Sequence, residues 1–336
     1  MGEFIQYPDR LSLAQLPTPI QALTRFPEKH AFGDCSIFIK RDDQTGAVTS
    51  GNKVRKLEFV LADALANKAT VLITCGGVQS NHCRTTVLLA AQLGLQCHLI
   101  LRGEAGELDN PDGNFFINHI VGAEISCYSS RDFKAHFNRI LAGLMSDYQA
   151  KGETPYFIPM GASDGTGVWG YVNACQEISE FCATTQTRFT DIVCATGSGG
   201  TLAGLIAGNA IYKLGAQVHG INVCDNAVYF KQKVRQDLIE WHRKYDIRDI
   251  DVNELDINII DGYVGAGYAK ADKEVIETIK EMARSQGLIL DPIYTGKAFN
   301  GLIREIGKGT FNASANILFL HTGGVFGLYS QRDKFY

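Results

Sequence analysis

The sequence contains no Cys-x-x-Cys pair, no long apolar run and no excess of basic charge. Its nine cysteines are scattered and odd in number, which favours free thiols in a reducing compartment over disulfides or a zinc site. We therefore expect no metal site, and we expect Cys75, Cys83 and Cys194 to be small core residues. The formal net charge of −4 argues against a nucleic-acid-binding protein, which would need a basic face.

No apolar run reaches the length of a transmembrane helix, so we expect no membrane association. The stretch from Met1 to Gln6 lacks a basic segment followed by an apolar one, and Gln6 stands where a myristoylation signal needs Ser or Thr. We therefore expect a cytoplasmic protein. With 336 residues, 45% of them hydrophobic, the chain is long enough for two domains.

Strand-like apolar runs alternate with helical periodicity along most of the chain. Strands are predicted at 36–40, 69–75, 95–101, 123–128, 156–159, 190–195, 218–223 and 315–321, and the main helices at 52–67, 131–151, 169–183, 226–245 and 270–286. This alternation predicts an α/β fold with parallel sheets. We expect two open, twisted α/β domains, a small one over 54–158 inserted into a larger one made of 1–53 and 159–336.

Three cations open the helix that is predicted from Asn52. Lys53, Arg55 and Lys56 lie in its first turn, where the helix dipole disfavours positive charge by about 0.3–1 kcal/mol. One interpretation is a solvated basic turn. The other is that positive surroundings lower the pKa of Lys53, which makes it nucleophilic, as an imine-forming lysine must be. The residues alone leave both open.

A glycine-rich loop, Ala195-Thr196-Gly197-Ser198-Gly199-Gly200-Thr201, lies between a predicted strand and a predicted helix. Glycines let the backbone approach an anion, and the helix start offers free N–H groups, so a phosphate would fit. The loop has neither the Walker lysine nor the glycine spacing of a dinucleotide site. These absences favour a monophosphorylated ligand, with a plain tight turn as the alternative, and they argue against a nicotinamide dehydrogenase.

Further polar residues follow other predicted strands. Ser80 and Asn81 open the helix after the strand that ends at Cys75, where Ser80 is either an N-cap or a hydroxyl that faces a ligand. Tyr268 and Tyr294 lie in glycine-punctuated loops and are either packing residues or proton carriers.

Five stretches, taken in order, resemble the motifs of one family. They are Ser50 to Phe59, Gly76 to His82, Thr196 to Thr201, Asp291 to Lys297, and His321 to Gly324. The chain is similar over Leu16 to Gly324 to the pyridoxal-phosphate enzymes of fold type II, the tryptophan-synthase β-like class. Within that class it looks like the branch of D-cysteine desulfhydrase and 1-aminocyclopropane-1-carboxylate deaminase.

The resemblance implies pyridoxal 5'-phosphate as the cofactor, bound by the larger domain, and assigns roles to residues. It implies that Lys53 holds the cofactor through an imine, that Asn81 bonds the phenolic oxygen, and that Ser80 binds the substrate carboxylate or moves protons. The implied catalytic residues are Lys53, Ser80, Tyr268 and Tyr294. The implied cofactor-binding residues are Lys53, Asn81, Ala195, Thr196, Gly197, Ser198, Gly199, Thr295 and Thr322. The implied substrate-binding residues are Ser80, Asn81, His82, Tyr268 and Tyr294. Relatives of this class are usually dimers, so a homodimer is expected.

Two threonines bear on the substrate. The deaminase carries a glutamate near the pyridine nitrogen where this chain has Thr295, and an apolar residue where it has Thr322. Both threonines are typical of the desulfhydrase. A carboxylate beside the pyridine nitrogen makes the ring a deep electron sink, which cyclopropane opening needs more than β-elimination does. Departures from the family pattern at Ser50, 161–167 and 269–272 leave the substrate less defined than the cofactor.

The predicted function is a pyridoxal-phosphate-dependent carbon–sulfur lyase that acts on a small amino acid. D-Cysteine desulfhydrase is favoured, with L-cysteate sulfo-lyase and then 1-aminocyclopropane-1-carboxylate deaminase as alternatives. Either Lys53 or a relay of Ser80 and Tyr294 removes the Cα proton, depending on the hand of the substrate. An alternative of another class is a non-catalytic α/β protein that binds a phosphorylated metabolite.

Overall fold

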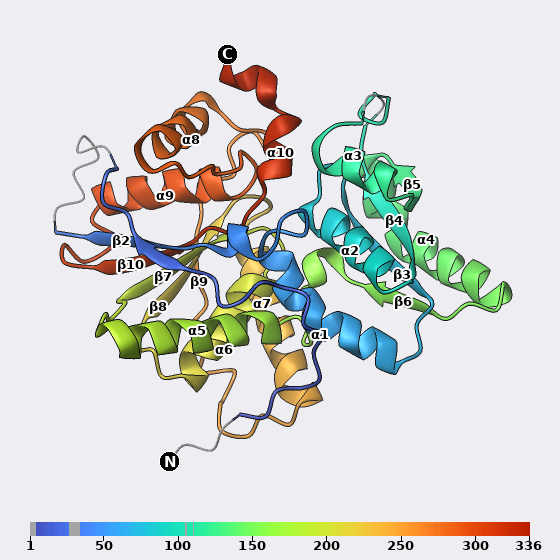
Figure 1. The fold of residues 1–336 in the computed structure, drawn as a ribbon, viewed down its shortest axis with the longest axis horizontal. Helices are drawn as coiled ribbons and strands as arrows, with labels where there is room; N and C mark the ends of the chain where they lie inside the picture. The colour runs from blue at the N-terminus through green and yellow to red at the C-terminus, as the bar shows by residue number, and fades with distance from the viewer. Residues whose placement is uncertain (1–4, 27–33, 105, 110) are drawn as a thin grey trace.

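Two mostly parallel sheets, each flanked by helices, form the protein (Figure 1). The structure is a computed structural model that describes residues 5–26, 34–104, 106–109 and 111–336. Residues 1–4, on which most of the expectation about an N-terminal signal rests, lie outside the described residues. None of the helices in the described ranges is both long and apolar enough to cross a membrane.

The larger sheet has the strand order β1-β2-β10-β7-β8-β9. Its strands are β1 (Ile20–Ala22), β2 (Ser36–Lys40), β7 (Asp191–Thr196), β8 (Gln217–Asn222), β9 (Asn258–Ile260) and β10 (Asn316–Leu320). All neighbours are parallel except β1, which pairs antiparallel with β2 at the edge. The prediction of parallel sheets is therefore wrong for this edge strand. Antiparallel neighbours can be joined by a short connection, whereas parallel strands need a longer crossover, usually through a helix.

The smaller sheet has the order β5-β4-β3-β6 and is entirely parallel. Its strands are β3 (Val71–Gly77), β4 (Gln96–Arg102), β5 (Glu124–Tyr128) and β6 (Pro155–Ile158). This sheet uses only residues 71–158, whereas the larger sheet takes strands from both sides of that segment. The domain boundaries at 54 and 158 stay a prediction.

Ten α-helices and three short 3₁₀-helices complete the described chain. The helices around the smaller sheet and the junction are α1 (Asn52–Ala66), α2 (Asn81–Gln92), α3 (Gly113–Ile120), α4 (Ser130–Ala150), η2 (Asp42–Gln44) and η3 (Met160–Ala162). The others are α5 (Trp169–Thr185), α6 (Gly200–Ile211), α7 (Ala227–Lys244), α8 (Lys273–Gln286), α9 (Thr295–Gly307), α10 (Val325–Tyr329) and η4 (Arg332–Phe335).

Sequence reasoning missed β1, β9, α9 and α10, and it placed Thr295 and Gly296 in a loop although they open α9. The cap explains the difference. The buried Asp291 carboxylate accepts hydrogen bonds from the N–H groups of Ile293, Tyr294 and Thr295 at 2.8–2.9 Å. Pro292 and Gly296 are typical of loops, so the local composition predicts a loop here. The start of α9 is stabilised instead by the Asp291 carboxylate.

Helix α1 lies at the junction of the two sheets. Val54, Leu57 and Leu61 pack in the core of the smaller sheet, while Phe59 packs in the main core of the larger one. The helix begins after Gly51, whose φ of 113° favours glycine, and the Asn52 N–H donates to the Thr322 carbonyl at 3.1 Å. The start of α1 is thereby joined to the carboxyl end of β10.

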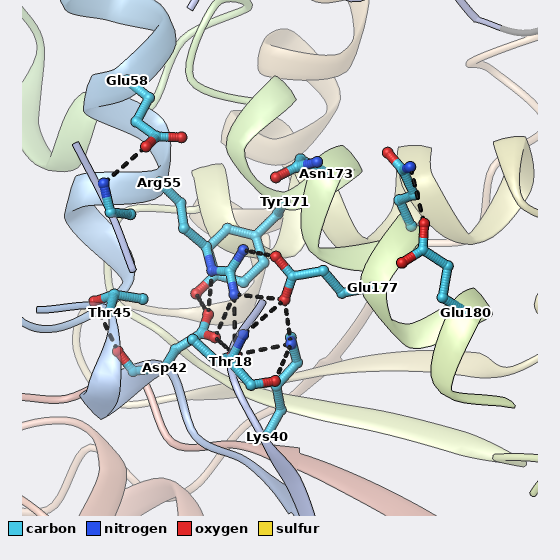
Figure 2. Close-up of polar contacts among 12 residues, drawn as sticks. Thr18, Lys40, Asp42, Thr45, Arg55, Glu58, Tyr171, Asn173, Glu177 and Glu180 are labelled. Atoms are coloured by element: carbon cyan, nitrogen blue, oxygen red, sulfur yellow. Dashed lines mark hydrogen bonds and ion pairs between the residues drawn. The ribbon is translucent and has the colours of Figure 1, made fainter. Parts of the chain in front are cut away.

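A buried network of charges fixes α1 against the larger sheet (Figure 2). The Arg55 guanidinium donates to both oxygens of Asp42 at 2.8–2.9 Å and to both oxygens of Glu177 at 2.7–2.9 Å. Lys40, at the end of β2, adds a 2.6 Å bond to Glu177, and the Tyr171 hydroxyl donates to Asp42 at 2.6 Å. Two cations and two carboxylates therefore neutralise one another in the interior.

The pKa values reflect this pairing. Although burial raises the pKa of Asp42, the Arg55 and Lys40 charges hold it below its ordinary value. The pKa of Glu177 is likewise lowered, because bonds from Arg55 outweigh the effect of burial. Arg55 is thus not the solvated cation of a basic turn.

Replacing Glu177 by Gln should destabilise the protein by about 3 kcal/mol, since it leaves Arg55 and Lys40 with one buried carboxylate between them. Denaturant unfolding measures the change. Glu180→Gln is the matched control, because Glu180 is exposed on the same helix and its carboxylate bonds, among the described residues, only Gln176. Its effect should stay within about 0.5 kcal/mol. Equal effects of the two variants would contradict the stabilising role of the network.

Candidate active site

A cavity of about 620 Å³ opens where strands of both sheets reach their carboxyl ends. Gly76 and Gly77 of β3, Arg102 of β4 and Thr196 of β7 contribute from these strand ends, and Thr322 follows β10. The strand ends of parallel α/β sheets are where such proteins place ligands. Its position makes this cavity the candidate active site.

The cavity brings together almost every residue that the sequence singled out. The predicted site residues that line it are Lys53, Ser80, Asn81, His82, Ala195, Thr196, Gly197, Ser198, Gly199, Tyr268, Tyr294 and Thr322. Thr295 is the exception: it is fully buried, and its hydroxyl donates to Asp291 at 2.7 Å and accepts from the Asp291 N–H at 2.8 Å. The hydroxyl of Thr295 supports the start of α9 and does not line the cavity.

Lys53, in the first turn of α1, extends into the cavity with its Nζ 2.8 Å from Asn52 Oδ1. Its amine lies 6.0 Å from the centroid of the Tyr294 ring. Burial, together with the nearby Arg84 charge, lowers the pKa of Lys53 to about 8, against the opposing effect of Asp291. Of the two interpretations of the basic turn, the structure supports the depressed pKa.

Asn81 opens α2 and is held by two donors. Its Oδ1 accepts from Arg84 Nη1 at 3.2 Å and from Asn114 Nδ2 at 3.0 Å, and Arg84 also donates to Asn114 Oδ1 at 2.8 Å. Because the oxygen of the amide is engaged in this way, its NH₂ group is left as a donor for a ligand. Arg84 is fully buried without a carboxylate partner in the described chain, and burial lowers its pKa to about 9.

Ser80 is the N-cap of α2, since its Oγ accepts from the Cys83 N–H at 3.2 Å. Ser80 also lines the cavity, so its role as an N-cap is compatible with a hydroxyl that faces a ligand, which stays a prediction. His82 Nε2 lies 2.7 Å from Thr74 Oγ1, which itself donates to the Ile158 carbonyl, so Nε2 carries the proton. Burial lowers the pKa of His82 well below its ordinary value, which leaves the imidazole neutral.

The glycine loop between β7 and α6 forms a cup of backbone amides. Gly199, at φ 91°, is the N-cap of α6, and the N–H groups of Gly197, Ser198 and Gly199 bond no residue in the described part of the chain. A Cβ on Gly197 would lie 2.8 Å from Tyr294 Cε1, so only glycine fits there. Free amides at a helix start bind phosphate well.

Lys56 brings a cation to this part of the interior. It lies three residues after Lys53 and therefore on the same face of α1, away from Arg55. Its Nζ is fully buried and, within the described residues, has no hydrogen-bond partner, and neither does Thr196 Oγ1 on the loop. Burial and the neighbouring Lys53 lower the pKa of Lys56 well below its ordinary value. The charges of Asp237 and Asp164 act on this amine without bonding it, so among the described residues it has no hydrogen-bonded anion.

Tyr268 and Tyr294 both line the cavity, with their hydroxyl oxygens in hydrogen-bond contact at 2.8 Å and their ring planes 68° apart. Burial raises the pKa of Tyr268 to about 12 and that of Tyr294 well above its ordinary value. Both hydroxyls are therefore protonated at neutral pH and act as donors rather than bases.

Comparison with known proteins agrees with this site. The family model described as "Pyridoxal-phosphate dependent enzyme" matches residues 11–323. The chain belongs to the pyridoxal-phosphate-dependent enzyme family. Its fold is the fold type II expected from the sequence, and the alternative of a non-catalytic metabolite-binding protein is set aside.

Individual relatives show which members of the family this chain resembles in sequence and structure. The mitochondrial bifunctional D-cysteine desulfhydrase/1-aminocyclopropane-1-carboxylate deaminase of Arabidopsis thaliana is 41% identical over 330 residues, 96% of this chain and 80% of the relative. A D-cysteine desulfhydrase of Salmonella paratyphi C is 37% identical over 96% of this chain and 95% of its own. A crystal structure described as an ACC deaminase homologue superposes with a TM-score of 0.84 at 35% identity, over 98% of this chain and 96% of that one.

The residues present fit the cofactor. The free amides of the glycine loop suit its phosphate, the NH₂ of Asn81, whose oxygen is already engaged, suits its phenolic oxygen, and the depressed pKa of Lys53 suits its aldehyde. Sequence reasoning noted Lys56 but gave it no role, and it missed Arg84 and Arg102 altogether. The three cations in the first turn of α1 were the signal in the sequence that could have singled out Lys56 as a candidate anion-binding residue.

Modification of the cofactor-free protein by pyridoxal phosphate at Lys53 should accelerate as the pH rises through about 8. Only the neutral amine attacks an aldehyde, and an ordinary lysine would reach that form near pH 10.4. Borohydride trapping at each pH, followed by peptide mass spectrometry, gives the profile. Lys53→Ala is the control for other lysines, and a profile that rises only near pH 10 would contradict the depressed pKa.

Proposed function

We propose that this pyridoxal-phosphate enzyme catalyses α,β-elimination on a small amino acid, with D-cysteine as the favoured substrate and pyruvate, hydrogen sulfide and ammonia as products. The observation that carries the proposal is the lack of a carboxylate at the inner end of the cavity. Among the described lining residues only Asp225 carries one, and Asp225 is exposed. Asp291, a buried acid whose charge acts on Lys53, is occupied by the amides that start α9.

Without a carboxylate beside the pyridine nitrogen, the site favours a substrate whose leaving group departs readily. The cofactor, when bound, supplies the electron sink that makes the Cα proton acidic. The chain supplies position: the amide cup and Lys56 hold the phosphate, Asn81 holds the ring oxygen, and Ser80 offers its hydroxyl to the substrate carboxylate.

Proton transfer at Cα falls to the group whose pKa lies near neutrality. That group is Lys53 Nζ, with a pKa of about 8, since burial keeps Tyr268 and Tyr294 protonated. The described structure has no hydrogen bond between Ser80 and Tyr294, so a relay between them would pass through the substrate. A homodimer and a cytoplasmic location remain predictions.

Lys56→Met should weaken pyridoxal phosphate binding on the order of 10- to 100-fold, because a hydrogen bond to a charged phosphate is lost. Its unfolding free energy without cofactor should not fall, since the variant removes a buried, unpaired amine. Titration with pyridoxal, which lacks the phosphate, should show no difference between the variant and the natural protein. Lys68→Met, at the exposed far end of α1, is the matched control. An equal loss for both ligands would place Lys56 outside the phosphate site.

A substrate panel tests the function itself. D-Cysteine should yield pyruvate and sulfide at a higher kcat/KM than L-cysteine, L-cysteate or 1-aminocyclopropane-1-carboxylate. Lys53→Ala should reduce turnover at least about 1,000-fold while circular dichroism shows the same fold. Production of a keto acid from 1-aminocyclopropane-1-carboxylate alone would show that the missing carboxylate does not determine the reaction.

A further inference from the structure

The loop over residues 261–272, between β9 and α8, brings Tyr268 into the cavity. The Tyr268 hydroxyl lies 2.8 Å from that of Tyr294. Shortly before Tyr268, Gly265 and Gly267 have φ angles of 64° and 130°, conformations that favour glycine. Because glycine leaves the backbone wide freedom, contacts from outside the loop are needed to fix the position of Tyr268.

The buried amine of Lys297, on α9, makes two such contacts. Its Nζ donates to the Val264 carbonyl at 2.7 Å and to the Gly267 carbonyl at 2.8 Å. Gly267 directly precedes Tyr268, so the second bond fixes the peptide that leads into the tyrosine. Lys297 is 2% exposed and does not line the cavity, so it is not placed to contact substrate or cofactor there.

The position of Lys297 in its own helix is unfavourable for its charge. Lys297 is the third residue of α9 and lies in the first turn, where the helix dipole disfavours a cation. Burial also disfavours the charge and lowers the pKa of Lys297 below its ordinary value, against the opposing charges of Asp272 and Asp291. The two carbonyl bonds are the contacts that offset these costs. Its contribution is therefore to the loop rather than to the helix.

The start of α9 thereby sets the positions of both tyrosines of the cavity. Tyr294 is the N-cap residue of α9, and the Asp291 carboxylate accepts its N–H at 2.9 Å. Lys297, three positions after Tyr294, holds the loop that carries Tyr268. The bond between the two hydroxyls uses one of their two protons and leaves the other for a ligand, so this donor arrangement requires both tyrosines in place.

We propose that Lys297 is a positioning residue, which holds the loop so that the Tyr268 hydroxyl stays against Tyr294 in the cavity. Lys297 acts through Tyr268, since it does not line the cavity itself. The inference rests on the proposed elimination for its kinetic measurements, whereas the state of the loop is measured without turnover.

Lys297→Met keeps the length of the side chain and removes its donors. In the cofactor-free variant, amide hydrogen exchange over residues 264–270 should accelerate on the order of tenfold, because the loop loses two bonds to a charged donor. Exchange in β10 and α6 should stay as in the natural protein. Lys273→Met, which changes an exposed lysine at the start of α8, is the matched control and should leave loop exchange unchanged. Acceleration throughout the protein, or none in the loop, would overturn the inference.

A double-mutant cycle on the intact holoenzyme tests whether Lys297 acts through Tyr268. Tyr268→Phe removes the hydroxyl alone, and with D-cysteine as substrate it should lower kcat/KM on the order of tenfold. Lys297→Met should lower kcat/KM at least as much, and the double variant should lie within about twofold of Lys297→Met. The affinity of Lys297→Met for pyridoxal phosphate should change less than about twofold. Losses that multiply in the double variant would show that Lys297 acts independently of Tyr268, which would overturn the inference.

Lys297→Gln is the second variant, because its side-chain amide keeps an NH₂ donor for one of the two carbonyls. It should accelerate loop exchange and lower kcat/KM by smaller factors than Lys297→Met, which keeps the test available where Lys297→Met does not fold. Natural values of both quantities in Lys297→Gln would overturn the role of Lys297. Failure of the natural protein to turn over any amino acid of the substrate panel would instead contradict the proposed function, and loop exchange would still decide whether Lys297 holds the loop.

Discussion

The buried ion network around Arg55 is the constraint on which the site depends. Two cations and two carboxylates from β2, η2, α1 and α5 are locked together beneath the junction of the sheets. Such a network is costly to desolvate and contributes little net stability, but it allows few alternative arrangements. Arg55 is held from four carboxylate oxygens, so the first turn of α1, and with it Lys53, has one position relative to the larger sheet.

From that position the three cations of one helical turn enter three environments. Arg55 bonds the carboxylates, the Lys56 amine is fully buried without a hydrogen-bond partner among the described residues, and Lys53 lines the cavity. Burial then shifts the pKa values of different groups in opposite directions, because it disfavours whichever form of a group is charged. It brings the pKa of Lys53 down to about 8 and raises that of Tyr268 to about 12, which separates a proton acceptor from a proton donor within one cavity.

Motif order and strand–helix alternation predicted much of this arrangement. Strand ends carry the site in a parallel α/β fold, so Ser80, the glycine loop and Thr322 could be assigned to one cavity from the chain alone. Thr295 could not be placed, because its side chain turns toward Asp291, a contact that no local pattern reveals. Arg102 was missed for a related reason: an arginine that ends a strand looks like any other until the structure shows it lining the cavity beside the Tyr268 ring.

The sequence by itself determined the α/β class and the family motifs, because these follow from periodicity and from residue types at short spacing. Through the resemblance of those motifs it indicated Lys53 as the candidate reactive lysine. Only the tertiary structure decided which cations are neutralised and which stay unpaired. Whether a charge is compensated depends on its neighbours in space. Arg55 bonds Glu177 across 122 positions of the chain, while Lys56, one residue further along, bonds no carboxylate in the described chain. Burial then converts that difference in partners into a difference in chemistry.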